Sequence, residues 1–167
     1  SQRGIGGRFK NTQNYIAEVK ENGEQIVRFM PLNPFEMPMA IEAICESFNR
    51  EIDSCEIDPL ILIPAFIIDF LCIHPFNDGN GRMSRLLTTL LLYRAGYVVG
   101  KYVSLESKIE KTKASYYEAL EKSDINWNAE GNDITPFVKY ILGTVLAAYR
   151  DFEERVAMVE GNISSLD

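Results

Sequence analysis

Residues 59–73, PLILIPAFIIDFLCI, are apolar at nearly every position and include one charged residue, Asp69. The stretch is too short to cross a bilayer, so we expect a core helix that is buried on all sides. Asp58 and Pro59 are suited to the N-cap and first turn of this helix. Pro64 lies inside the stretch and predicts either a kink or a helix that begins there.

The loop that follows, HPFNDGNGR at residues 74–82, contains two successive turn dipeptides, Asp-Gly and Asn-Gly. Behind it an amphipathic helix is predicted from about residue 81 to residue 95, and Gly96 ends it. Taken alone, the glycines would merely permit a sharp reversal of the chain, because Asx-Gly pairs are common turns.

Outside this central segment, the pattern predicts more helices and one pair of strands. Asn22-Gly23 separates β-branched and aromatic runs at residues 15–19 and 26–29, which indicates a β-hairpin. The fold class is therefore all-α, a helical bundle with one β-hairpin near the N-terminus. Helical periodicity predicts the remaining helices over residues 39–53, 104–122 and 133–158.

The composition fits one globular domain. Of the 167 residues, 46% are hydrophobic and 25% are charged, which excludes disorder and a disulfide scaffold. The formal net charge of -7 repels the phosphate backbone of a nucleic acid, so we expect no nucleic acid partner. We also expect no membrane partner, because the longest apolar stretch is too short to cross a bilayer. Cys45, Cys55 and Cys72 form no CxxC pair and lie in apolar surroundings. They indicate inert core thiols and a reducing, cytoplasmic location.

Several features make the loop at residues 74–82 a candidate phosphate site. Glycines at the start of a helix leave backbone N–H groups accessible, and the helix dipole adds positive charge. Arg82 and Arg85 share one face of the first turn and could clamp phosphates. His74, the only histidine, and Asp78 supply a general base and a carboxylate suited to Mg²⁺. Without these neighbours, a lone histidine at a helix end is more often a structural cap.

Residues 74–85, HPFNDGNGRMSR, resemble the signature HxFx[DE]GNGRxxR of the Fic (filamentation induced by cAMP) domain family at every fixed position. The resemblance covers roughly residues 8–149. It implies a single Fic-type domain within residues 1–167, which we expect to be a fragment of a longer protein. In this interpretation the hairpin is the family's flap, and the segment 104–120 forms the nucleoside side of the site.

The resemblance implies Mg-dependent transfer of AMP from ATP to a Ser, Thr or Tyr hydroxyl of a target protein, with release of pyrophosphate. His74 would remove the proton from the attacking hydroxyl. Asp78 would bind the Mg²⁺ that bridges the α- and β-phosphates. Arg82 would stabilise the leaving phosphates, and Arg85 would hold the terminal phosphate.

The resemblance also assigns groups around the nucleotide. Flap residues would clamp it and offer a strand edge to a substrate segment, loop amides would cradle the phosphates, and two tyrosines would contact the adenosine. For either tyrosine alone, a simple core role is an equally good interpretation. Phe76 would hold the loop, and a polar contact to adenine near Asp124 is left open. The flap, loop and tyrosine residues are, in that order, Asn14, Tyr15, Ile16 and Ala17; Gly79, Asn80 and Gly81; and Tyr116 and Tyr117.

In many family members a glutamate in an [ST]xxxE[GN] helix competes with the terminal phosphate for the second arginine. The segments that end in Glu130 and Glu160 have the Glu-Gly pair but lack the Ser or Thr, so neither predicts an inhibitory helix. We therefore expect the chain to bind ATP and to modify a target, or itself, without an activator. Any inhibitory helix would lie upstream of Ser1 or on a partner.

Two other functions stay open at this point. Related domains transfer a phosphoryl or phosphocholine group, but the phosphoryl-transferring relatives have a degenerate anion loop, whereas Gly81 is intact here. A non-catalytic nucleotide-binding regulatory module would need no base, and the intact His74 argues against it. The sequence predicts neither the target protein nor the oligomeric state, and a homodimer is left open.

Overall fold

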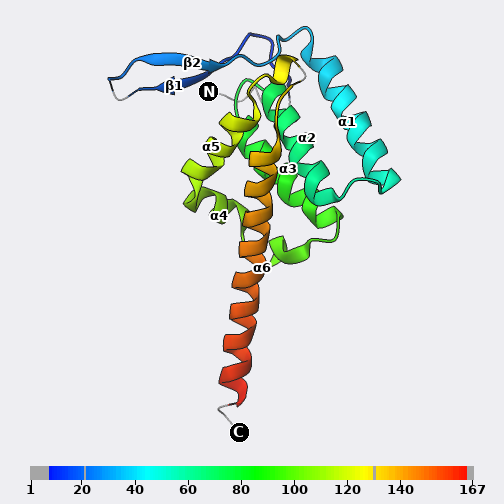
Figure 1. Cartoon of the computed structure of the whole chain (residues 1–167), viewed down its shortest axis with the longest axis vertical. Coiled ribbons are helices and arrows are strands. Elements are labelled where there is room, and N and C mark those ends of the chain that lie inside the picture. Colours follow the sequence, from blue (N-terminus) through cyan, green and yellow to red (C-terminus); the bar gives the residue numbers. More distant parts are fainter. Residues whose placement is uncertain (1–7, 21, 130, 165–167) are drawn as a thin grey trace.

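The computed structural model describes residues 8–20, 22–129 and 131–164. Within these residues, six α-helices form a bundle, and a two-stranded antiparallel sheet lies at one end of it (Figure 1). The predicted all-α class with one hairpin is confirmed. In chain order the elements are β1 Ile16–Val19, β2 Gln25–Phe29, α1 Met37–Ser54, α2 Pro59–Ile73, α3 Asn80–Arg94, α4 Leu105–Lys111, α5 Lys113–Ser123 and α6 Thr135–Ser164, with short 3-10 turns at Val98–Lys101 and Trp127–Ala129.

Helix α2 is the centre of the bundle, and α1, α3 and α6 pack around it. Asp58 caps it, because the Leu60 N–H donates to Asp58 Oδ1 at 2.8 Å. The helix begins at Pro59 and continues through Pro64, which is fully buried, so the alternative start at Pro64 is wrong. The core placement of α2 fixes where its C-terminal end, and the loop behind it, meet the hairpin.

The single helix predicted over residues 104–122 is wrong, because the chain forms α4 and α5 with a break at Thr112. The Thr112 hydroxyl donates to the Lys108 carbonyl at 2.9 Å and lies 2.8 Å from the Tyr140 hydroxyl. A threonine that bonds back to its own helix bends it. The predicted apolar face is still buried on both sides of the break, at Leu105, Ile109, Tyr116 and Leu120.

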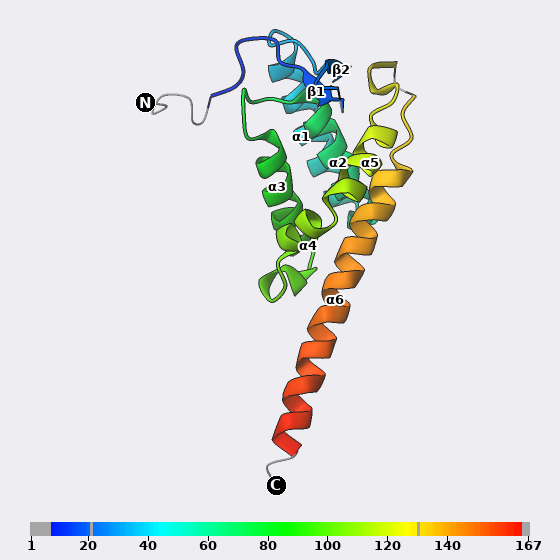
Figure 2. The ribbon, with the colours of Figure 1, turned by 90° about the vertical axis from the view of Figure 1, so that its left-hand side faces the viewer.

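The hairpin confirms the predicted strand pair. Ala17 pairs with Val27, and the turn is closed by the Lys20 N–H, which donates to the Glu24 carbonyl at 2.9 Å. Gly23 has φ 81°, a left-handed conformation that glycine adopts without strain. The hairpin lies beside α5 at the end of the bundle where α2 ends and α3 begins (Figures 1 and 2).

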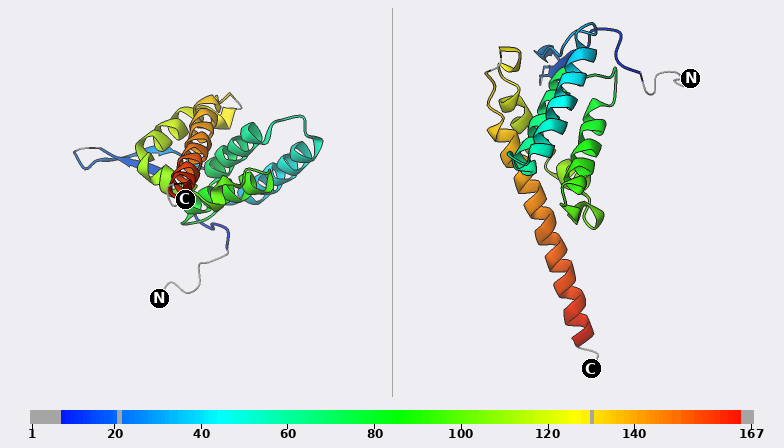
Figure 3. Two further views of the ribbon diagram at one scale, coloured as in Figure 1. Left: turned by 90° about the horizontal axis from the view of Figure 1, so that it is seen from below. Right: turned by 90° about the vertical axis from the view of Figure 1, so that its right-hand side faces the viewer.

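Helix α6 is longer than predicted and reaches Ser164. Its first half packs against α2, α4 and α5, while its second half projects away from the bundle (Figures 2 and 3). Glu130 and the side chain of Glu160, both considered as inhibitory residues, lie outside what the structure describes. In the part of the chain that is described, no helix is both long and apolar enough to span a bilayer.

The three cysteines are free thiols in different surroundings. Cys72 is buried in the core and Cys45 is partly buried, as predicted. The prediction is wrong for Cys55, which is exposed at the C-cap of α1 with φ 57°. Its side chain faces solvent because α1 ends there.

Candidate active site

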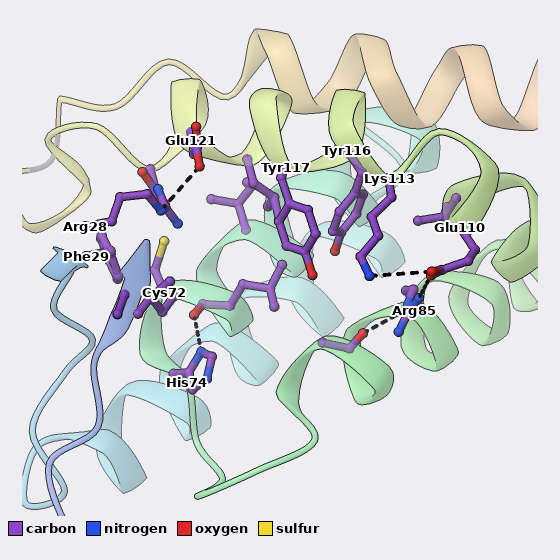
Figure 4. Close-up of a pocket in the computed structure, with 18 residues that line it drawn as sticks. Arg28, Phe29, Cys72, His74, Arg85, Glu110, Lys113, Tyr116, Tyr117 and Glu121 are labelled. Carbon is purple, nitrogen blue, oxygen red and sulfur yellow. Dashed lines mark hydrogen bonds and ion pairs between the residues drawn. The ribbon is translucent and has the colours of Figure 1, made fainter. Parts of the chain in front are cut away.

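A pocket of about 580 Å³ opens between the hairpin, the end of α2, the start of α3, and α4 and α5 (Figure 4). It brings together one part of the predicted site residues, namely Ile16, Ala17, His74, Gly81, Arg85, Tyr116 and Tyr117. The others lie around it without lining it, namely Asn14, Tyr15, Asp78, Gly79, Asn80 and Arg82.

His74 is the C-cap of α2 and is held in a left-handed conformation with φ 54°, which is unusual for a residue other than glycine. Its Nδ1 lies 3.1 Å from the Leu71 carbonyl oxygen. A carbonyl can only accept, so Nδ1 carries the proton and Nε2 is left with its lone pair. Burial lowers the pKa of His74, the Leu71 hydrogen bond opposes this shift, and the nearby Lys10 charge adds to it. The imidazole is therefore neutral near pH 7.

The candidate phosphate loop at residues 74–82, called the anion loop below, leads into the N-terminus of α3. Gly79 is its N-cap, with φ 88°, and the first intrahelical bond runs from the Met83 N–H to the Gly79 carbonyl at 2.8 Å. The amides at positions 80–82 therefore have no intrahelical acceptor. Asp78 Oδ1 accepts from the Gly79 N–H at 2.6 Å. The loop thus has the backbone geometry that favours a phosphate.

The Asn80 side chain braces this loop by hydrogen bonds to its backbone. This role of the side chain was not predicted from the sequence. It is buried, with 2% exposed, and it bonds twice to the Phe76 backbone: Oδ1 accepts from the N–H at 2.9 Å, and Nδ2 donates to the carbonyl at 2.7 Å. Phe76 itself is half-buried between the rings of Phe9 and Phe70. The loop is therefore fixed by side chains on both sides.

Arg85 lies across the pocket from His74 (Figure 4). Its Nε donates to the Gly81 carbonyl at 3.2 Å, and its Nη1 lies 3.3 Å from Glu110 Oε2 on α4. Lys113 Nζ lies 3.5 Å from the other oxygen of Glu110. Glu110 and Lys113 are pocket residues that were not predicted from the sequence. Two cations with one carboxylate leave this corner of the pocket positive, which suits a phosphate.

Asp78 and Arg82 lie at the exposed rim of the loop. Their side chains are 91% and 73% exposed, and Arg82 Nη2 is 3.5 Å from Asp78 Oδ2. In the described ranges, no group of three or more His, Cys, Asp and Glu side chains could hold a metal ion. Mg²⁺ in nucleotide sites is typically held by one or two carboxylates together with substrate phosphates and water. An accessible carboxylate beside an anion loop fits this kind of binding, so Asp78 is a suitable ligand.

The two tyrosines line the pocket from α5. Tyr116 is buried and packs edge-on against Phe137 and Tyr140, at ring distances of 5.7 and 5.6 Å, and burial raises the pKa of its phenol. Tyr117 is 50% exposed and packs edge-on against Tyr116. The hydroxyl ends of both rings point into the pocket (Figure 4). Tyr116 is thus a core residue and a pocket residue at once.

Of the four predicted flap residues, only Ile16 and Ala17 face the pocket. The Asn14 side chain joins the start of the flap to the anion loop, because its Nδ2 donates to the Phe76 carbonyl at 3.1 Å. Tyr15 is 58% exposed. The first part of the flap therefore braces the loop, and the second part covers the pocket.

Arg28 of β2 fastens the flap to α5, and the sequence analysis missed it. Its Nη1 lies 2.9 Å from Asp124 Oδ2, and its Nε lies 3.6 Å from Glu121 Oε1. All three residues line the pocket. Burial raises the pKa of Asp124, whose role was left open, and the Arg28 contact opposes the shift. The ion pairs hold the hairpin over the pocket.

The chain is similar to known proteins over most of its length. A family model described as Fic/DOC family matches residues 2–92. Protein adenylyltransferase fic-1 of Caenorhabditis elegans is 30% identical over 135 residues, which are 81% of this chain and 22% of that protein. The chain spans less than a third of the length of the curated relatives it matches.

Two solved structures share the fold. A Fic family protein from Desulfovibrio desulfuricans G20 has a TM-score of 0.69 and 30% identity, and the match covers 89% of this chain and 41% of that chain. A Fic domain containing signaling protein from Bacteroides thetaiotaomicron VPI-5482 has a TM-score of 0.67 and 27% identity. This match covers 85% of this chain and 52% of that chain.

Proposed function

Because the chain belongs to the Fic/DOC family, we propose that it transfers AMP from ATP to a hydroxyl side chain of a protein and releases pyrophosphate. One observation carries the proposal: a neutral histidine with an unprotonated Nε2 and an arginine-flanked helix N-terminus line the same pocket, at His74 and Arg85. A module that only binds nucleotide would not need the base. The name protein adenylyltransferase, given to several relatives, supports AMP as the transferred group.

The phosphates of ATP would lie along the start of α3. The amides at positions 80–82 have no intrahelical acceptor and could donate to phosphate oxygens, and Arg82 and Arg85 would add charge-assisted hydrogen bonds. Asp78 would hold Mg²⁺, which when bound neutralises charge on the phosphates. The nucleoside would extend toward α5, where Tyr116 and Tyr117 present their hydroxyl ends.

In the transfer step, Nε2 of His74 accepts the proton of the target hydroxyl as its oxygen attacks the α-phosphorus. The bond between the oxygen and the α-phosphorus forms, and the bond from the α-phosphorus to the pyrophosphate oxygen breaks. The Leu71 carbonyl keeps the Nδ1 proton in place and stabilises the positive imidazolium that results. The Leu71 carbonyl therefore takes the place that a carboxylate has beside the histidine of a catalytic triad.

The flap gives the target protein a place to bind. Ile16 and Ala17 line the pocket, so a substrate segment that pairs with this strand would bring its hydroxyl beside the nucleotide. The free thiols of Cys45, Cys55 and Cys72 support a reducing compartment, and we propose the cytoplasm.

The decisive experiment uses ATP labelled on either the α- or the γ-phosphate. The chain is incubated with Mg²⁺ and candidate targets, and label on protein is measured. AMP transfer puts only the α-label on protein. Label from the γ-phosphate would instead indicate phosphoryl transfer, and label from neither, with ATP still bound, would indicate a binding module.

We also propose that the 167-residue chain needs no activator. The same α-label assay tests this with the isolated chain. An inert chain that Glu160→Gly alone switches on would contradict the proposal and identify Glu160 as an inhibitory residue.

A further inference from the structure

Lys10 is a buried lysine that the proposed mechanism does not use. Only 3% of its surface is exposed, although it lies in a polar, Gly-rich part of the sequence. Its Nζ donates to the Ile73 carbonyl and to Asn14 Oδ1, both at 3.0 Å. Lysines are rarely buried, because the ammonium loses its hydration, and both acceptors here are neutral. The arrangement therefore needs an explanation other than an ion pair.

The contacts of Lys10 lie on both sides of His74. The side chain bonds to the carbonyl of Ile73, and the backbone N–H donates to the carbonyl of Pro75 at 2.8 Å. The residues immediately before and after His74 are thus held by one residue of the N-terminal segment. The Ile73 carbonyl is also one of those left without a helical partner at the end of α2, where a positive charge is favourable.

We propose that Lys10 is a positioning residue for His74, which fixes the left-handed turn that directs the imidazole into the pocket. The inference rests on the proposed function only in taking His74 as the base. Without the two bonds from Lys10, the strained backbone at His74, with φ 54°, would lose its support on both sides.

Lys10 also acts on His74 through its charge. The pKa of His74 is lowered first by burial and then by Lys10, while the Leu71 hydrogen bond raises it. Burial lowers the pKa of Lys10 itself to about 8, so Lys10 is charged at neutral pH. The other charged groups that line the pocket are Arg28 and Asp124 near the flap, Arg85 on α3, and Glu110, Lys113 and Glu121 on α4 and α5.

The test uses the fact that His74 is the only histidine, so its ring signals in an NMR titration are assigned without ambiguity. Lys10→Met removes the side-chain donor and the charge, while the backbone N–H can still donate to Pro75, and we expect the pKa of His74 to rise toward the ordinary value of about 6.5. The transfer rate at saturating ATP should fall about 10- to 100-fold, because the base is misplaced. ATP affinity should stay within about threefold, since the anion loop is intact.

Two variants serve as controls. Lys10→Arg keeps a charge and donors, so it should keep the low pKa of His74 and most of the rate. Lys139→Met removes one charge from an exposed lysine on α6 and should change neither. A folded Lys10→Met chain with an unchanged pKa of His74 and an unchanged rate would overturn the proposal.

If Lys10→Met does not fold, the NMR titration of the wild-type chain tests the proposal instead. The ring signals of His74 should then show a second, smaller step at alkaline pH, where Lys10 loses its charge. Absence of this step would overturn the proposal. The titration needs no activity, so an inactive chain that shows the step would support the role of Lys10 and contradict the proposed AMP transfer alone.

Discussion

The first residue of the motif at residues 74–85 and the exposed rim of its loop differ in how the fold holds them. At its start, His74 is fixed by backbone bonds, and the buried Asn80 side chain braces the loop behind it. At its rim, the Asp78 and Arg82 side chains are 91% and 73% exposed. The group that would move a proton is therefore positioned before any ligand binds, whereas the groups that would meet phosphates are accessible to them. The fold thus preorganises His74, the residue whose position would limit the rate of transfer.

The strongest test of this difference removes the base. His74→Ala should lower the rate of α-label transfer by ~10²–10⁴-fold, because the chain has no second histidine. ATP binding, measured by calorimetry, should persist. A transfer rate above about a tenth of wild type would contradict the role of His74 as general base.

The exposed rim is tested with Asp78. Asp78→Ala should abolish Mg-dependent transfer, a loss of about 10²-fold or more, while the melting temperature stays nearly unchanged because the side chain is exposed. Asp78→Glu keeps the carboxylate and should retain part of the activity. Unchanged Mg²⁺ dependence of the rate in Asp78→Ala would refute this assignment.

The braced side is tested with Asn80. Asn80→Ala leaves the Phe76 N–H without its acceptor in a buried loop, which should lower the free energy of unfolding by about 1–3 kcal/mol. Denaturant titration measures this change. Asn128→Ala, at an exposed asparagine, is the matched control and should have no comparable effect. Equal stability of the two variants would show that the loop is not braced by Asn80.

The pH dependence separates the two ends further. Since the pKa of His74 is lowered, the base stays unprotonated at pH values where an ordinary histidine is half protonated. The transfer rate should therefore hold steady as the pH falls through about 6.5 and decline only below it. As the pH falls, the histidine of the unfolded chain is protonated before that of the folded chain, because only the folded chain lowers its pKa. Protonation then favours the unfolded state, so the free energy of unfolding should also decrease in that acidic range. A pH–rate profile with its midpoint at or above 6.5 would argue against a buried neutral base.

The smallest expected effect concerns Glu110, which draws Arg85 and Lys113 toward α4. Glu110→Gln should raise ATP affinity by about two- to fivefold, because the removed ion pairs are partly exposed and screened. Glu106→Gln, at an exposed position on the same helix, is the control. Weaker ATP binding in Glu110→Gln would show that Glu110 orients Arg85 for the ligand.

The local parts of this site could be predicted from sequence patterns, whereas single polar contacts between distant segments could not. The helix cap at Asp58 and the turn at Gly79 follow from backbone preferences of neighbouring residues, so they could be predicted. The burial of Lys10 could not be predicted, because its partner Ile73 lies 63 positions away. A lysine in a polar segment is normally exposed. The contact between the hydroxyls of Thr112, at the helix break, and Tyr140, on another helix, could not be predicted either. Single polar contacts between distant segments leave no periodic trace in a sequence.

The Arg28 ion pair also has a consequence for the order in which the molecule assembles. It joins positions 96 residues apart, so a long loop of chain must close before the contact can form. The packing of α2 against α1 and α3 needs only short connections and can form first. The hairpin would then dock last, and it would also be the first segment to detach from an otherwise intact bundle. Amide hydrogen exchange should therefore be faster at the strands than in α2, even though both surround the same pocket.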